Sequence, residues 1–263
     1  MNRVLKSLES HKQNWESKHF EKTKYGKQLA ALKNIHKGER CFVIGNGPSL
    51  TANDLQILHE NQVITFATNR VYNIFEQTEW RPTYYVSEDV NVLRNVQDKA
   101  SVVPAKKKFI PINLKWYEDI NIKDALYFYL DYNSEIKESF NISTDIPHGI
   151  RCRATVTTTC IHLAMHMGFS EIYLLGVDHS FAKMIDKYGN VIEDSSIRSH
   201  FVDDYNSDIE DLGYNIDATT EAYMDFEKLS YKIKSFRIFN ATRGGKLEVY
   251  ERVDFDELFK NKK

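Results

Sequence analysis

The stretch Cys41-Phe42-Val43-Ile44-Gly45-Asn46-Gly47-Pro48-Ser49-Leu50 joins a short apolar run to a turn with two glycines, an asparagine and a proline. Four apolar residues bounded by glycine are too few for a helix and predict a buried strand over residues 41–44. Gly45 and Gly47 permit backbone geometry that a Cβ atom would forbid, and they let a ligand approach the main chain. Ser49 or Thr51 can cap a following helix. The stretch therefore predicts a strand, a turn and a helix suited to binding phosphate.

The residues of this turn narrow the choice of phosphate ligand. Leu50 stands where a dinucleotide fingerprint has its third glycine, and the next apolar run, residues 63–67, ends in Thr68-Asn69-Arg70 instead of a carboxylate. The lysine of a P-loop is also absent. These departures count against NAD and against a standard ATPase. They leave open the alternative that the turn only connects a strand to a helix.

Composition sets wider bounds on the class of protein. The chain has 263 residues, 42% hydrophobic and 27% charged, with a formal net charge of -2, which indicates a globular protein without the basic excess of a nucleic-acid binder. Cys41, Cys152 and Cys160 are spaced like neither a zinc site nor a disulfide framework, so we expect a reducing cytoplasm. No stretch approaches the ~20 apolar residues of a membrane span, so any membrane contact is expected to be peripheral.

Three segments are expected to lie outside the sheet. Residues 1–37 are rich in Lys, Glu, Gln and His, which predicts a helical extension that packs on the body or on a second subunit of a homo-oligomer, with a solvated arm as the alternative. Residues 38–263 then form one catalytic domain. Residues 131–150 are polar and irregular and predict a mobile loop, and the polar segment 183–196 is long enough for a lid.

Strands alternate with helices along the rest of the chain. Apolar runs at residues 63–67, 84–86, 108–112, 125–130 and 171–177 predict strands, and a helix over residues 155–167 is stopped by Gly168. This alternation predicts an α/β fold with a doubly wound, mainly parallel, Rossmann-like sheet. Ligands of such sheets bind at the carboxyl ends of the strands. Four groups therefore converge there: the glycine turn, Asn69-Arg70, Glu88-Asp89 and Asp178-His179.

Several motifs recur together in a known superfamily. They are Gly45-Asn46-Gly47-Pro48-Ser49-Leu50, Ala67-Thr68-Asn69-Arg70, Pro82-Thr83-Tyr84-Tyr85, the run from Gly168-Phe169-Ser170 to Gly176-Val177-Asp178-His179, Ser199-His200-Phe201, and Asn240-Ala241-Thr242 onward to Val253. With them the chain resembles bacterial proteins that carry the DUF115 domain, the family of archaeal 6-hydroxymethylpterin diphosphokinase-like proteins, over roughly residues 38–259. It is also similar to the bacterial sialyltransferases of glycosyltransferase family 42.

The second resemblance implies a Rossmann-like, GT-A-like variant fold and a metal-independent site for CMP-sialic acid. Matched position by position, it implies that Asn46 and Asn69 lie at the nucleotide and its phosphate, that Arg153 lies near the donor, and that His200 is the general base. Where the sialyltransferases have a tyrosine two residues after the aspartate of this strand, the chain has Ser180. Tyr188 is the candidate to replace that tyrosine as a hydrogen-bond donor to the phosphate.

The candidate site combines these motifs with the strand ends. The catalytic candidates are His200 and His179. The candidates for nucleotide and donor binding are Gly45, Asn46, Gly47, Pro48, Ser49, Asn69, Arg70, Arg153, Thr155, Asp178, Ser180 and Tyr188. No metal site is expected.

Some of these residues have structural alternatives. Asp178 can cap a turn instead of touching a ligand, and Arg153 can pair with an acid. We expect His162 and His166 to be ordinary helix residues because no third zinc ligand is suitably spaced. Asp254-Phe255-Asp256 matches a metal-binding pattern of other glycosyltransferases but is expected to form a solvated face.

The sequence thus favours a cytoplasmic, inverting glycosyltransferase that moves a nonulosonic acid from a CMP donor to a surface-glycan acceptor, without a cofactor. Its partners would be the nucleotide sugar and the glycan, with at most peripheral membrane contact and no nucleic acid. One alternative is a pterin diphosphokinase that uses ATP and Mg²⁺, for which Glu88, Asp89 and Asp178 are the candidate metal ligands. Another is a nucleotide-binding protein without chemistry of its own.

Overall fold

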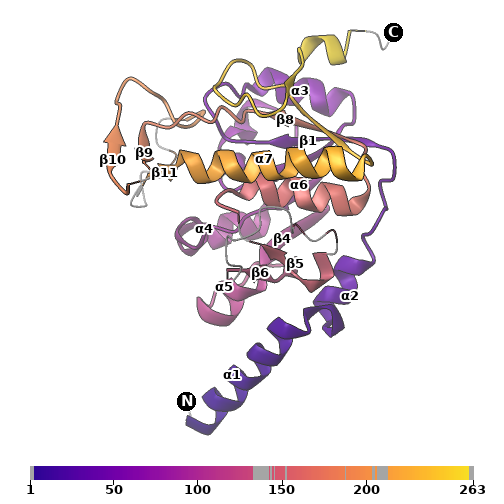
Figure 1. Ribbon diagram of the computed structural model, residues 1–263, viewed down its shortest axis with the longest axis vertical. Coiled ribbons are helices and arrows are strands. Elements are labelled where there is room, and N and C mark those ends of the chain that lie inside the picture. Colours follow the sequence, from indigo (N-terminus) through magenta and orange to yellow (C-terminus); the bar gives the residue numbers. More distant parts are fainter. Residues whose placement is uncertain are drawn as a thin grey trace.

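The computed structural model describes residues 3–132, 142, 144, 146–151, 153–186, 188–202, 205 and 213–260, with the backbone alone at residues 3–9. An eight-stranded sheet runs in the order β13-β12-β8-β1-β2-β3-β4-β5, and every neighbouring pair is parallel (Figure 1). Its strands are β1 (Arg40–Ile44), β2 (Ile64–Thr68), β3 (Tyr84–Val86), β4 (Lys107–Pro111), β5 (Ala125–Phe128), β8 (Glu171–Leu175), β12 (Arg237–Asn240) and β13 (Glu251–Arg252). The expected α/β, Rossmann-like fold is confirmed.

The chain changes direction across the sheet at β1. Strands β2 to β5 extend the sheet on one side of β1, whereas β8 lies on its other side and continues to β12 and β13. Ile44 at the end of β1 lies opposite Leu175 at the end of β8. The two strands therefore form the topological switch point, where doubly wound sheets have their ligand crevice.

The central strands are apolar along their whole length because helices cover both faces of a parallel sheet. Residues 41–44 and 172–175 are buried. Phe42 stacks on Tyr173 of the neighbouring strand, with ring centroids 5.0 Å apart. The predicted strand at residues 125–130 is an edge strand, but it ends at Phe128, and Leu130 begins a separate short pair, β6 (Leu130–Asp131) with β7 (Ile150–Arg151).

Helices α6 (Val156–Met167) and α7 (Ile216–Ile233) pack on each other along one face of the sheet (Figure 1). The predicted helix at residues 155–167 is confirmed, and Gly168 ends it with a φ of 88°, a left-handed conformation that favours glycine. The other helices are α3 (Ala52–Glu60), α4 (Val90–Val102) and α5 (Ile112–Tyr117), with 3-10 turns η2 (Val71–Gln77), η3 (Ile146–His148) and η4 (Asp256–Leu258).

The N-terminal segment is helical, as expected, and consists of α1 (Arg3–Lys18), η1 (Phe20–Lys22) and α2 (Lys24–Ala30). Helix α1 projects from the body (Figure 1). Phe20 and Leu29 are fully buried in the main core, and α2 contacts β5. Packing on the body thus begins at Phe20, inside the segment predicted as an extension. The domain boundary at residue 37 stays a prediction.

The segment expected to be a lid forms regular structure. Strands β9 (Lys183–Ile185) and β10 (Val191–Glu193) make an antiparallel hairpin, to which β11 (Tyr214–Asn215) adds a parallel strand. Whether this hairpin closes over a ligand stays a prediction. The expected mobile loop at residues 131–150 falls mainly outside the described residues.

The cysteines and the helices bear on two expectations from the sequence, a reducing compartment and the absence of a membrane span. Cys41 and Cys160 are buried free thiols, whereas Cys152 lies outside the described residues. In the described part of the chain, no helix combines the length and the apolar character that a membrane crossing requires.

Candidate functional site

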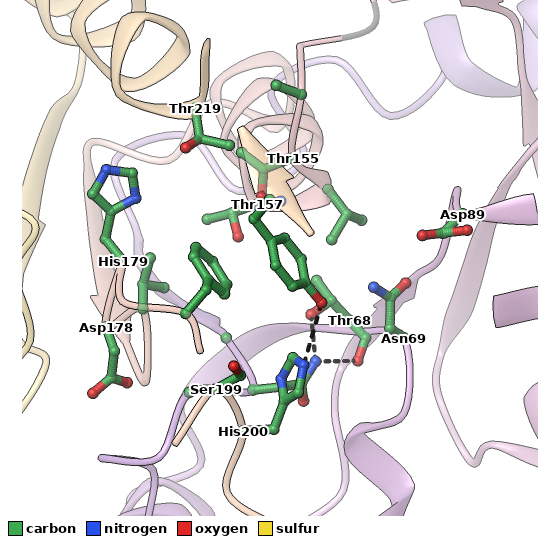
Figure 2. A pocket seen from close by; sticks show the side chains of 18 of the residues that line it. Thr68, Asn69, Asp89, Thr155, Thr157, Asp178, His179, Ser199, His200 and Thr219 are labelled. Atoms are coloured by element: carbon green, nitrogen blue, oxygen red, sulfur yellow. Dashed lines mark hydrogen bonds between the residues drawn. The ribbon is translucent and has the colours of Figure 1, made fainter. Parts of the chain in front are cut away.

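A cavity of about 400 Å³ lies at the carboxyl ends of β1, β2, β3 and β8 (Figure 2). Its walls combine the strand ends with the N-terminal turns of α4, α6 and α7 and with residues 199–200. Nine of the predicted site residues line it: Gly45, Asn46, Gly47, Asn69, Thr155, Asp178, His179, Ser180 and His200. The structure thus brings together residues that are spread over 156 positions of the sequence.

The glycine turn is held by the neighbouring strand end. The N–H groups of Gly45 and Gly47 donate to the carbonyl oxygens of Leu175 and Gly176, each at 2.8 Å. A Cβ atom on Gly47 would lie 1.9 Å from Oδ2 of Asp178, and one on Gly45 would lie 2.4 Å from the Gly176 oxygen. Neither glycine has a positive φ. The expectation that these positions need glycine for its backbone freedom is therefore wrong. They need glycine because the ends of β1 and β8 approach each other too closely to leave room for a Cβ atom.

Asp178 supports this turn from inside the protein. Its Oδ2 accepts hydrogen bonds from the Ser49 hydroxyl at 2.7 Å and from the Ser49 N–H at 3.4 Å. Burial raises the pKa of Asp178, while the bonds from Ser49 act in the opposite direction. The carboxyl group thus holds the glycine turn, a structural role that differs from the expected cap of the turn after Asp178. Thr51, and not Ser49, caps α3 by accepting from the Asp54 N–H at 3.1 Å.

Asn46 presents its side chain between β1 and β2. Its Nδ2 donates to the backbone oxygen and the hydroxyl of Thr68, at 3.0 and 3.1 Å (Figure 2). Its Oδ1 is buried and has no hydrogen-bond partner in the described part of the chain. A buried amide oxygen without a partner costs free energy unless a ligand donates to it. Asn46 is therefore fixed in place with one acceptor left for a ligand.

Three non-glycine residues of the cavity wall have left-handed backbone conformations. They are Asn69, Ala154 and His179, with φ values of 47°, 57° and 53°. Such conformations cost free energy and gather where a site must be held in a fixed shape. Asn69 is also held by its side-chain oxygen, which accepts from the Ser87 hydroxyl at 3.0 Å. The cavity wall is thus rigid on three separate loops.

His200 lines the cavity and is drawn at the lower end of the group of side chains in Figure 2. Its ring stacks on Tyr205 with centroids 3.9 Å apart, and its Nε2 is 3.3 Å from the hydroxyl of Tyr214. The next residue, Phe201, donates its N–H to the backbone oxygen of Asn46 at 3.1 Å. The segment that carries the predicted base is therefore attached directly to the glycine turn.

His179 faces the cavity from the other side. Its Nε2 lies 2.7 Å from the hydroxyl of Thr220, which itself donates to the Ile216 carbonyl. Because that hydroxyl proton is already used, Nε2 of His179 must be the donor. Burial lowers the pKa of His179, which favours the neutral ring. His179 is thus a neutral imidazole at the wall of the cavity.

The remaining predicted residues do not line the cavity. Arg153 forms an ion pair with Asp225, which is its structural alternative. Arg70 is buried, and its backbone N–H donates to the Tyr205 hydroxyl at 3.2 Å. Tyr188 is 78% exposed in the turn between β9 and β10. Pro48 and Ser49 belong to the glycine turn but do not line the cavity. No Lys or Arg is found among the described residues that form the cavity wall.

The two histidines of α6 and the C-terminal acidic motif also lie outside the cavity and contact other parts of the protein. His162 and His166 are buried in α6, where His162 packs against Phe226 and Nε2 of His166 is 3.0 Å from the Leu29 carbonyl. In the C-terminal acidic motif, Asp256 pairs with Arg243 at 2.6 Å. No group of three or more residues suited to hold a metal ion occurs in the described ranges.

Backbone N–H groups supply positive potential in place of those cations. Helices α4 and α6 both begin at the cavity wall, with Asp89 and Thr155 as their N-caps. The N-terminus of a helix carries a partial positive charge and free N–H groups, which bind anions. The Asn91 and Val92 N–H groups already donate to Asp89, and the Thr157 N–H donates to Thr155. The wall therefore offers a phosphate group the partial positive charge of the two helix ends and their remaining N–H groups.

Several cavity residues were missed by the sequence analysis. Glu88 was expected at this edge of the sheet, but its only proposed role was that of a magnesium ligand in the alternative function. Tyr205, Tyr214 and Tyr223 line the cavity together with Thr157 and Thr219. These residues carry no motif and reach the cavity only through folding.

Comparison with known proteins adds a family and a fold. The family model described as "6-hydroxymethylpterin diphosphokinase MptE-like" matches residues 16–184. Among solved structures, the MAf glycosyltransferase from Magnetospirillum magneticum AMB-1 is similar with a TM-score of 0.50 and 15% sequence identity. The similarity covers 88% of this chain but only 38% of that protein, and at this identity it shows the fold alone. No curated protein matches the sequence.

Proposed function

We propose that this chain, which belongs to the 6-hydroxymethylpterin diphosphokinase MptE-like family, is an inverting glycosyltransferase that works without a metal ion. Its donor would be a nucleotide sugar, with a nonulosonic acid linked to CMP as the best candidate, and its acceptor a hydroxyl group of a surface glycan. The buried free thiols Cys41 and Cys160 favour a reducing compartment such as the cytoplasm. Peripheral contact with the inner face of a membrane fits a surface-glycan acceptor.

The observation that carries this proposal is the polarity of the cavity at the β1–β8 switch point. Its wall offers helix N-termini, the Asn46 amide and two imidazoles, and none of its described residues is Lys or Arg. A nucleoside monophosphate leaving group develops less charge than a diphosphate and needs fewer cations. The cavity therefore suits a CMP sugar better than a nucleoside di- or triphosphate.

The reaction assigns His200 the role of general base. The neutral imidazole takes the proton of the acceptor hydroxyl while the acceptor oxygen bonds to the anomeric carbon from the face opposite the phosphate. The bond between the anomeric carbon and the phosphate oxygen breaks, and its electron pair leaves with CMP. The N-termini of α4 and α6 stabilise that phosphate. Tyr214, 3.3 Å from Nε2, orients the ring.

The family description favours a second candidate, pyrophosphoryl transfer from ATP to a pterin. That reaction normally needs Mg²⁺ held by carboxylates. The three carboxylates at the strand ends already accept protein hydrogen bonds: Asp178 from Ser49, Asp89 from the Asn91 N–H at 2.8 Å, and Glu88 from Thr159 at 2.7 Å. A nucleotide-binding protein without chemistry of its own stays a third alternative.

A panel of nucleotides measured by thermal shift separates the candidates. We expect CMP or CDP to raise the melting temperature equally in EDTA and in Mg²⁺, since a ligand at 100 times its dissociation constant adds about 2.7 kcal/mol of stability. UDP, GDP and ATP complete the panel. Stabilisation by ATP only when Mg²⁺ is present would favour the diphosphokinase, and binding without turnover would favour the third alternative.

A further inference from the structure

Glu88 is an acidic residue of the cavity wall that the proposed reaction does not use. It follows β3 at the carboxyl end of the sheet and lines the cavity together with its neighbour Asp89. One of its carboxylate oxygens accepts a hydrogen bond from the Thr159 hydroxyl of α6 at 2.7 Å. Within the described ranges, Glu88 forms no ion pair with Lys, Arg or His. Its charge is therefore uncompensated by a protein cation.

Two buried carboxylates elsewhere in the molecule are compensated by cations. Asp54, 1% exposed, accepts a bidentate pair of hydrogen bonds from Arg243 at 2.9–3.1 Å. Asp225, 6% exposed, pairs with Arg153 and lies 3.9 Å from the Lys228 ammonium. Both lie away from the cavity. Asp178, the buried carboxylate that does line the cavity, is held by Ser49 instead of an arginine. Glu88 accepts one hydrogen bond from Thr159 and has no cation beside it in the described ranges, which points to a role toward a ligand.

We infer that Glu88 limits the charge of the phosphate group that the cavity accepts, so that nucleoside monophosphates are selected over di- and triphosphates. This inference rests on the proposed function. Because no described residue of the wall is Lys or Arg, the negative charge of each further phosphate group is repelled by the Glu88 carboxylate and is not offset by a cation. A unit charge ~8 Å from a carboxylate, at an effective dielectric constant of about 40, changes affinity roughly fivefold.

The groups around Glu88 determine how its charge varies with pH. Desolvation raises the pKa of Glu88 to about 7; the hydrogen bond from Thr159 opposes this, and the neighbouring Asp89 adds to it. On α6 the nearby titratable group is Cys160, whose thiol stays protonated because burial raises its pKa. The other titratable residues of the wall are Tyr132, Asp178, His179, His200, Tyr205, Tyr214 and Tyr223. The selection against charge should therefore be stronger at pH 8.5 than at pH 6.

The test compares Glu88→Gln with the intact chain by calorimetric titration of CMP, CDP and ATP in EDTA at pH 6 and pH 8.5. Glutamine keeps an oxygen for the Thr159 hydroxyl but carries no charge. We expect the preference for CMP over CDP to fall roughly fivefold at pH 8.5 in the variant, with a smaller change at pH 6. The preference over ATP should fall further, because ATP carries more charge.

Asp89→Asn is the matched control. It removes the same charge from the adjacent residue, asparagine is an equally good helix N-cap, and Asp89 is exposed, so solvent screens its charge. An equal or larger effect of Asp89→Asn would overturn the inference, as would an unchanged CMP preference in Glu88→Gln. A further ATP titration replaces EDTA by Mg²⁺: binding to the intact chain but not to Glu88→Gln would also overturn the inference, because it would make Glu88 a metal ligand. If none of the nucleotides binds the intact chain, the proposed function fails and the inference fails with it.

Discussion

The two sides of the cavity differ in what their polar groups contact. On the turn side, Gly47, Ser49 and Asp178 bond and pack against one another across the ends of β1 and β8. Elsewhere in the wall, Glu88 and His200 line the cavity with titratable side chains. The glycine turn, the most recognisable motif of the sequence, is therefore largely structural, because it connects the ends of β1 and β8. The residues suited to chemistry lie on other segments of the cavity wall.

The largest effect is expected on the chemical side. Replacing His200 by Gln should lower turnover roughly 10²- to 10⁴-fold, the usual contribution of a general base, because glutamine cannot accept the proton. Nucleotide affinity should stay within a few-fold, because the base acts on the acceptor. The measurements are the initial rate with saturating donor and calorimetric binding of CMP. Retention of more than about a tenth of the turnover would remove His200 from this role.

Gly47→Ala tests the turn side. The added Cβ would lie 1.9 Å from Asp178 Oδ2 and 2.7 Å from the Gly176 oxygen, so the two strand ends must separate. We expect the free energy of unfolding to fall by about 3 kcal/mol in urea denaturation, as for other overpacked sites. Gly189→Ala is the control, since its Cβ meets nothing within 4 Å and only its φ of 85° opposes the change. Equal losses in both variants would contradict the close-contact explanation.

Glu88 should make stability depend on pH. Its pKa is about 7 in the folded protein against 4.5 as the ordinary value, so between these values the folded state binds more protons and stability falls as pH rises. The loss is complete about one unit above pH 7. Glu88→Gln lacks this dependence, so its stability relative to the intact chain should rise by about 3 kcal/mol from pH 4.5 to pH 8. Urea denaturation at several pH values measures it, and a flat difference would show that the Glu88 pKa is ordinary.

The smallest effect is expected at Asn46, the residue that joins both sides. Asn46→Ala removes the amide oxygen that lacks a protein partner, together with the bonds to Thr68. We expect CMP affinity to fall about tenfold while the fold is kept, because no core volume is lost. Calorimetric titration and a thermal melt measure the two quantities. Unchanged affinity with unchanged stability would locate the nucleotide elsewhere.

Much of the fold could be predicted because its central strands are short apolar runs between turn residues. The strands at residues 41–44 and 84–86 and the helix ended by Gly168 were found from such local patterns. Helix α7 and strands β12 and β13 were not predicted individually. Their residues are mixed in polarity because each has an exposed face, as the burial pattern of β12 shows. Local patterns weaken where burial is one-sided.

By itself, the sequence determined the parallel sheet and the convergence of Asn46, Asn69, Glu88 and Asp178 at one edge, because the carboxyl ends of parallel strands lie at the same edge of a sheet. Only the tertiary structure decided what each side chain does there. Arg153 forms an ion pair with Asp225, and Asp178 accepts hydrogen bonds from Ser49. Glu88 has no cation as a partner in the described part of the chain. Such pairings join residues as far apart as 129 positions. Charge compensation depends on distances in space, which a linear pattern does not contain.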